Sequence, residues 1–157
     1  MTATTPRHMA VQSAALLVAI AFLVVGLLGF IPGVTTDYGS LEWAGPDSGA
    51  KLFGAIAVSG AHNVMHLAFA VVGLVLTRSY ASARAYLIGG GLIYLAVWVY
   101  KSFADGRINF VPTGGASDWL HFGLGAAMVI LGLTLAGQRD PTKRRRRKVA
   151  RKDAKGP

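Results

Sequence analysis

Four apolar segments follow one another along the chain, separated by polar stretches. The first covers residues 10–31, carries no charge and ends just before Pro32 and Gly33. The third and fourth cover residues 84–103 and 117–137, and both are uncharged through their middles. Because about 20 apolar residues cross a hydrocarbon core of about 30 Å, each of these three segments predicts a membrane-spanning helix.

The second segment, residues 60–77, is less regular because its first turns are polar. After His66 its charge-free apolar part has only eleven residues. We therefore interpret Lys51 to Ala61 as a partly interfacial lead-in and expect the span itself to begin near Gly60. With this segment the chain has four predicted spans.

The pattern predicts an all-α fold, an integral membrane four-helix bundle. Residues 1–9 form a cytoplasmic N-terminal segment, residues 10–137 the transmembrane domain and residues 138–157 a polybasic cytoplasmic tail. The first segment is expected to stay as an anchor, because it is long for a signal peptide and no A-x-A site follows it.

Composition agrees with a membrane as the solvent. Of 157 residues, 53% are hydrophobic and 15% charged, which is too apolar for one small water-soluble core.

The net charge of +9 belongs to the tail, since ten of the sixteen lysines and arginines lie between Arg139 and Lys155. Nucleic acid is not a favoured partner, because no aromatic residues are interleaved with these cations. Cysteine is absent, which excludes disulfides and thiolate metal sites.

The distribution of charge predicts the orientation of the four helices. With both termini inside, thirteen cations are cytoplasmic, and only Lys51, Lys101 and Arg107 lie outside. Cytoplasmic loops carry the excess of lysine and arginine in membrane proteins. We therefore expect a multi-pass protein of the bacterial cytoplasmic (inner) membrane with cytoplasmic N- and C-termini.

A short polar motif occurs at the head of the second and fourth segments. At an offset of 55 residues, Gly60-Ala61 aligns with Gly115-Ala116, Asn63 with Asp118, and His66 with His121. This internal repeat predicts two helical hairpins in parallel arrangement, the first two helices followed by the last two.

These motifs resemble a known family. The H-N-x-x-H-L sequence at residues 62–67, the related polar-x-x-His at 118–121 and a Gly-rich third helix are similar to the actinobacterial membrane family catalogued as domain of unknown function 4383. The second copy in that family usually has Asp-Asn before x-x-His, whereas Ser117-Asp118 stands here. The resemblance implies a four-helix membrane protein and assigns no activity to it.

A structural role is our favoured interpretation of the histidine motif. Residues three and four apart share one helix face, so His62, His66 and Asn63 are expected to lie together, opposite Asp118 and His121. Such side chains can cap helix starts and bond across a bundle in lipid. The structural polar motif comprises Asn63, His66, Ser117, Asp118 and His121, with Ser117 or Asp118 as the cap of the fourth helix.

A binding site is the alternative. No cofactor is predicted, but His62, His66, Asp118 and His121 have the donor types for a transition metal such as zinc or copper. A b-type haem between His66 and His121 would use the same geometry. A proton relay would need further ionisable stations, and none follows either histidine along its helix.

No catalytic motif is recognised, so the protein is not expected to be an enzyme. Gly89-Gly90-Gly91 lies inside a span and lacks the lysine and Ser or Thr of a P-loop, which favours close helix packing instead. The favoured function is a structural or accessory membrane component of unknown molecular activity. Its partners are the lipid bilayer and a further copy of the chain or another membrane protein.

The tail supplies one more expected contact. Six consecutive cations sit just beyond the fourth span, where each can add about 1 kcal/mol of attraction to anionic lipid headgroups. They are Lys143, Arg144, Arg145, Arg146, Arg147 and Lys148.

Overall fold

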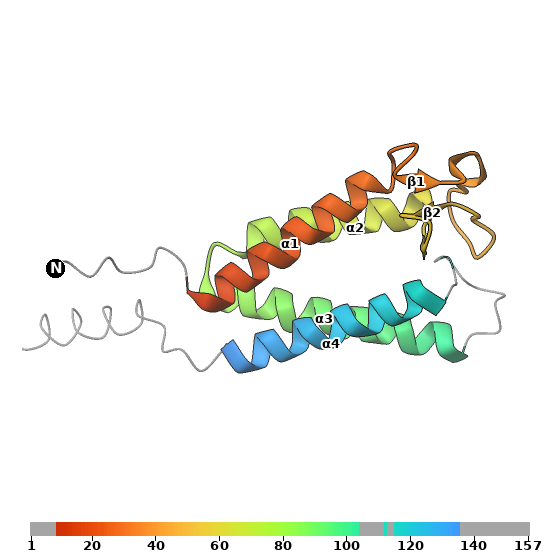
Figure 1. Cartoon of the computed structure of the whole chain (residues 1–157). Coiled ribbons are helices and arrows are strands. Elements are labelled where there is room, and N and C mark those ends of the chain that lie inside the picture. Colours follow the sequence, from red (N-terminus) through yellow and green to blue (C-terminus); the bar gives the residue numbers. More distant parts are fainter. Residues whose placement is uncertain (1–8, 104–111, 113–114, 136–157) are drawn as a thin grey trace, which may run out of the picture.

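The chain folds into an all-α bundle of four helices, as predicted (Figure 1). A computed structural model describes residues 9–103, 112 and 115–135. Its helices are α1 (Ala10–Leu28), α2 (Gly60–Leu76), α3 (Tyr80–Phe103) and α4 (Gly115–Thr134). The start of α1, the turn between α2 and α3 and the end of α4 lie at one end of the bundle, and the strands lie at the other (Figure 1).

The helices pack as two hairpins. α1 packs chiefly against α2 and α3 against α4, whereas the contact between α2 and α3 is much smaller. Small residues explain the close approach of α3 and α4, because a Cβ at Gly91 would lie only 2.7 Å from the carbonyl oxygen of Gly125. The loose boundary between α2 and α3 leaves room for the cavities described below.

Length and composition indicate a membrane protein. Among the described residues, α1, α3 and α4 are long and apolar enough to cross a membrane. α2 has 17 residues, a length of about 25 Å, at the lower edge of what a span requires. Many large apolar side chains, such as Leu17, Val71 and Leu133, are exposed on the outside of the bundle. The buried core includes Phe22, Tyr86, Leu87, Tyr94 and Met128.

The loop between α1 and α2 contains a small sheet that the sequence pattern did not predict. Strands β1 (Thr35–Thr36), β2 (Lys51–Leu52) and β3 (Ile56–Ala57) pair antiparallel in that order, and a 3₁₀ turn, η1 (Tyr38–Ser40), follows β1. Leu52 is buried against a cluster that includes Val25 and Leu28 of α1. Two-residue strands are too short to produce a readable alternation of polar and apolar positions.

The helix bounds differ from the predicted segments by a few residues. α1 ends at Leu28 rather than residue 31, α3 begins at Tyr80 rather than residue 84, and α4 begins at Gly115 rather than residue 117. α2 begins at Gly60, and β2 and β3 both lie within the expected lead-in from Lys51 to Ala61. Residues 1–8 and the predicted tail, residues 138–157, lie outside the described residues.

Candidate functional site

Three histidines meet where α2 and α4 approach each other. His62 and His66 stand four residues apart on α2, and His121 lies on α4; each is 4% exposed. The ring centroids of His62 and His66 are 4.4 Å apart, and those of His62 and His121 are 5.1 Å apart. The cluster therefore joins side chains from both hairpins.

Two aromatic rings from the other helices enclose these imidazoles. The ring of Phe22 on α1 lies 5.5 Å from His66, and that of Tyr94 on α3 lies 5.4 Å from His121. Phe22 and Tyr94 are 5.2 Å apart, centroid to centroid. Neither residue was singled out by the sequence analysis. A tyrosine in the middle of a predicted span was the available signal, because its hydroxyl needs a partner in lipid.

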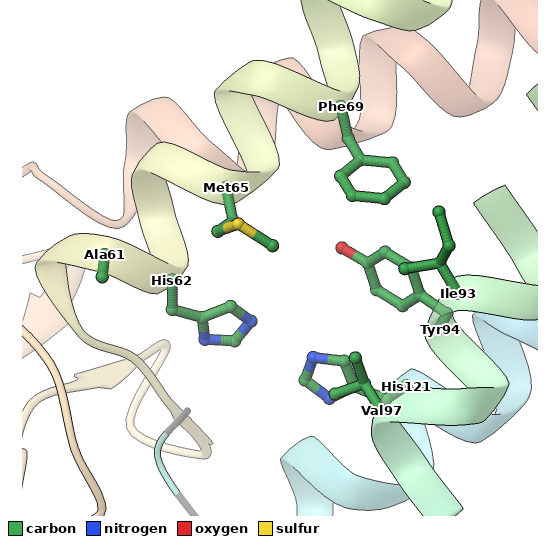
Figure 2. Close-up of a pocket in the computed structure, with 8 residues that line it drawn as sticks. All are labelled: Ala61, His62, Met65, Phe69, Ile93, Tyr94, Val97 and His121. Atoms are coloured by element: carbon green, nitrogen blue, oxygen red, sulfur yellow. The ribbon is translucent and has the colours of Figure 1, made fainter. Parts of the chain in front are cut away.

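A cavity of about 290 Å³ lies beside the histidines (Figure 2). Its wall is apolar except for His62, His121 and Tyr94. Figure 2 shows the imidazole of His62 directed from α2 toward that of His121. The lining residues are Ala61, His62, Met65, Phe69, Ile93, Tyr94, Val97 and His121. His66 is not among them.

The hydrogen bonds of the two cavity histidines differ. Nδ1 of His121 lies 2.5 Å from the carbonyl oxygen of Ser117. Because a carbonyl only accepts, Nδ1 must donate, and Nε2 of the neutral ring is then an acceptor. The backbone of Ala57 lies near His62, yet neither nitrogen of His62 reaches hydrogen-bond geometry with any described residue. A buried polar group in this state calls for a partner.

Asn63 does not join the cluster, although the sequence placed it on the same face. It is fully buried on the α1 side of α2, where its amide lies so close to Gly29 that a Cβ there would overlap it. One residue along a helix turns the side chain by about 100°. Asn63 therefore points to α1 while His62 points to α4.

Asp118 is also directed elsewhere. Its carboxylate forms an ion pair with the ammonium group of Lys101 on α3, which also donates to the carbonyl oxygen of Pro112 at 2.9 Å. The side chain of Lys101 is 3% exposed and that of Asp118 34% exposed. By its place in the sequence Lys101 is one of the outer cations, and no local pattern predicts its pairing with Asp118.

The donor set expected for a metal is therefore not assembled. Within the part of the chain that the structure describes, no three His, Asp or Glu side chains are grouped to hold a metal ion. Asp118, one of the four expected ligands, is paired with Lys101. Of the two residues expected to hold a haem, only His121 lines the cavity.

The start of α2 is capped by its own loop and not by the motif. The first four N–H groups of a helix have no intrahelical partner. In α2 those of Gly60 and Ala61 donate to the carbonyl oxygens of Glu42 and Trp43, at 3.0 and 2.7 Å. That of His62 donates to Oγ of Ser59 at 3.2 Å, and the N–H of Asn63 makes the first regular helix bond, to O of Ser59 at 2.9 Å.

The expected cap of α4 also differs from the observed arrangement. Ser117 and Asp118 are the third and fourth residues of α4, inside the helix and not at the position before it. Ser117 is fully buried, and its carbonyl oxygen accepts the hydrogen bond from His121.

Other side chains supply hydrogen bonds between helices. Oη of Tyr86 on α3 donates to the carbonyl oxygen of Phe69 on α2 at 3.2 Å. Nε of Arg84 donates to the carbonyl oxygen of Gly132 on α4 at 3.3 Å. Nε2 of Gln12 on α1 donates to Thr77 at the end of α2 at 2.9 Å. The task of fastening the bundle, expected of the histidine motif, is thus shared by residues outside it.

The six cations expected to contact lipid headgroups, Lys143 to Lys148, lie outside the described residues. Their role therefore stays a prediction.

Comparison with known proteins yields one match. The family described as "Domain of unknown function (DUF4383)" matches residues 12–134, from the first helix to the end of the fourth. No curated protein and no solved structure matches the chain. The match covers most of the chain and both polar motifs, so the protein belongs to the DUF4383 family, whose function is unknown.

Proposed function

We propose that this protein is a non-enzymatic accessory component of the bacterial cytoplasmic membrane that holds a small molecule in its histidine-lined cavity. One observation carries the proposal. The buried imidazoles of His62 and His121 lie side by side in the wall of a cavity of about 290 Å³, with ring centroids 5.1 Å apart, and His62 has no hydrogen-bonded nitrogen among the described residues. An unpaired buried polar group costs about 1 to 3 kcal/mol, which a bound molecule would offset.

The structural interpretation of the histidine motif is weaker, because other residues cap the helix and join the helices. The helix-start groups of α2 are satisfied by Ser59, Glu42 and Trp43. Lys101 and Tyr86 join neighbouring helices. The histidines are thus not needed for capping, and a binding role accounts for their burial beside a cavity.

The proposed orientation puts both termini in the cytoplasm. The start of α1, the α2–α3 turn with Arg78 and the end of α4 share one end of the bundle (Figure 1). The excess of cations in the sequence belongs to that end, in keeping with the bias of cytoplasmic loops. The histidine cavity then lies in the outer half of the membrane.

Purified protein tests the proposal. The full chain is extracted in mild detergent, and its bound molecules are measured by native mass spectrometry, metal analysis and visible absorption. We expect an organic molecule at stoichiometric amounts that is lost in His62→Ala and in His121→Ala. His66→Ala is the matched control, since it removes an equally buried imidazole that does not line the cavity, and it should retain the molecule.

Two results would contradict the proposal. Protein that carries no ligand and only loses thermal stability in His62→Ala and His121→Ala would return the motif to a structural role. Stoichiometric metal, or a Soret band that the substitutions abolish, would establish the metal or haem alternative instead.

A further inference from the structure

A second cavity continues from the histidine cavity along the boundary between α2 and α3. Its volume is about 430 Å³, and it shares Met65, Phe69 and Ile93 with the first cavity. The lining residues are Met65, Ala68, Phe69, Val72, Leu76, Ala85, Tyr86, Gly89, Gly90 and Ile93. The two cavities adjoin at the shared residues, and we call the pair the α2–α3 groove.

The groove lies on a face of the bundle that would meet lipid. Met65 and Ile93 are each 51% exposed, and Val72 is 50% exposed. From His62 at one end to Leu76 at the other is fourteen residues of α2, a length of about 21 Å. This is about two-thirds of the hydrocarbon core, enough to hold an extended chain parallel to the helices.

The chemistry of the wall changes along the groove. The second cavity, which we call the lower groove, is lined by apolar side chains and glycines apart from Tyr86, whose hydroxyl donates to Phe69. The other end of the groove, at the first cavity, contains His62, His121 and Tyr94. A wall that is apolar along its length and polar at one end matches a molecule with a hydrocarbon chain and a small polar head.

The hydrogen-bond roles of the histidines define the head. Nδ1 of His121 donates to the carbonyl oxygen of Ser117, so Nε2 of the neutral ring is an acceptor and a ligand that binds it must donate. His62 offers one donor and one acceptor nitrogen when neutral. A carboxylate, a ketone or an ester can only accept, whereas a hydroxyl both donates and accepts.

We infer that the α2–α3 groove binds a hydroxyl-headed membrane lipid, with its hydroxyl hydrogen-bonded to His62 and His121 and its hydrocarbon chain along α2 and α3. The inference rests on the proposed function and adds the class of ligand and its direction of entry. Long-chain alcohols, quinols and diacylglycerols share this chemistry. Mass spectrometry of the organic extract of the purified protein identifies which of them is bound.

Two glycines allow a matched test of the lower groove. Gly89 lines it, and a Cβ at Gly89 would meet nothing within 4 Å, so Gly89→Phe can place a ring in the groove from a position with room for the Cβ. Gly123 on α4 has the same open space and lines neither cavity. Gly123→Phe therefore controls for a new phenylalanine on the surface of the bundle.

The experiment measures labelling by a long-chain alcohol. The full-length protein in nanodiscs is irradiated with hexadecanol that carries a photoreactive diazirine on its chain, and labelled peptides are identified by mass spectrometry. We expect labels on α2 and α3 near Gly89, displaced by unlabelled hexadecanol. Loss of one hydrogen-bond partner in His62→Ala or His121→Ala should reduce labelling about tenfold. Gly89→Phe should abolish it, and Gly123→Phe should leave it unchanged.

The remaining outcomes separate the inference from the proposed function. If butanol competes as well as hexadecanol and Gly89→Phe has no effect while labelling still depends on His62, the cavity binds a small molecule and the lipid inference is wrong. If hexadecane competes as well as hexadecanol, the hydroxyl has no role and the inference is also wrong. If labelling depends on neither histidine, and His62→Ala protein retains every bound molecule, the proposed function is wrong as well.

Discussion

Two aligned polar motifs, residues 60–66 on α2 and 115–121 on α4, each bury one histidine to the same extent. Their other polar residues differ in burial and in partners. His66 and His121 are equally buried, each at 4% exposure. Asn63 is fully buried against Gly29, whereas the aligned Asp118 is 34% exposed and paired with Lys101. The charged residue, Asp118, thus stands where a cation lies beside it. The neutral amide, Asn63, stands where Gly29 packs against it.

The difference extends to the cavity. His62 in the first motif faces the cavity, while the aligned Ser117 in the second lies behind His121 and accepts its hydrogen bond. One motif therefore contributes an imidazole with no hydrogen-bonded nitrogen among the described residues, and the other contributes an imidazole with a fixed tautomer. A pair of motifs that were identical in structure could not present this combination of donor and acceptor to one ligand.

Placing the aligned aspartate at Asn63 is expected to have the largest effect on stability. Asn63→Asp introduces a fully buried carboxylate against Gly29, and we expect the free energy of unfolding to fall by about 3 to 5 kcal/mol. Denaturation in detergent with increasing SDS measures this loss. Asn63→Leu is the matched control with a smaller expected loss, because it fills the same buried site with a side chain of similar size and no charge; equal losses would contradict the assigned environment.

Loss of the ion pair between Lys101 and Asp118 is expected to have an intermediate effect on stability. Lys101→Met removes the ammonium group and leaves the Asp118 carboxylate partly buried without its cation, at a cost of about 1 to 3 kcal/mol. The same SDS titration measures it. The double variant Lys101→Met with Asp118→Asn should recover part of the loss, since no charge then remains unpaired. Additive losses in the double variant would show that the two side chains do not interact.

Loss of the Ser59 cap at the start of α2 is expected to have the smallest effect on stability. Ser59→Ala removes the hydroxyl that accepts from the His62 N–H, and such a loss costs about 1 kcal/mol. Thermal unfolding followed by circular dichroism measures the shift. Ser59→Thr retains a hydroxyl and should stay close to the original stability. If the alanine variant were as stable as the threonine variant, the cap would contribute nothing to α2.

Much of the site was visible in the sequence through local spacing. His62 and His66 are four residues apart, so a helix places both on one face. The direction of Asn63 and Asp118 was not visible, because it depends on which neighbouring helix lies beside each residue. Lys101, Tyr94 and Phe22 come from other segments, and no local pattern connects them with the histidines.

The sequence by itself determined four helices, their apolar surfaces and the burial of paired histidine motifs, because helix periodicity and span length are local properties of the chain. Only the tertiary structure decided that His62, His66 and His121 meet, that Lys101 takes Asp118, and that the loop before α2 folds into a sheet and caps the helix. These outcomes depend on long-range packing, where the open boundary between α2 and α3 leaves a groove that no single segment encodes.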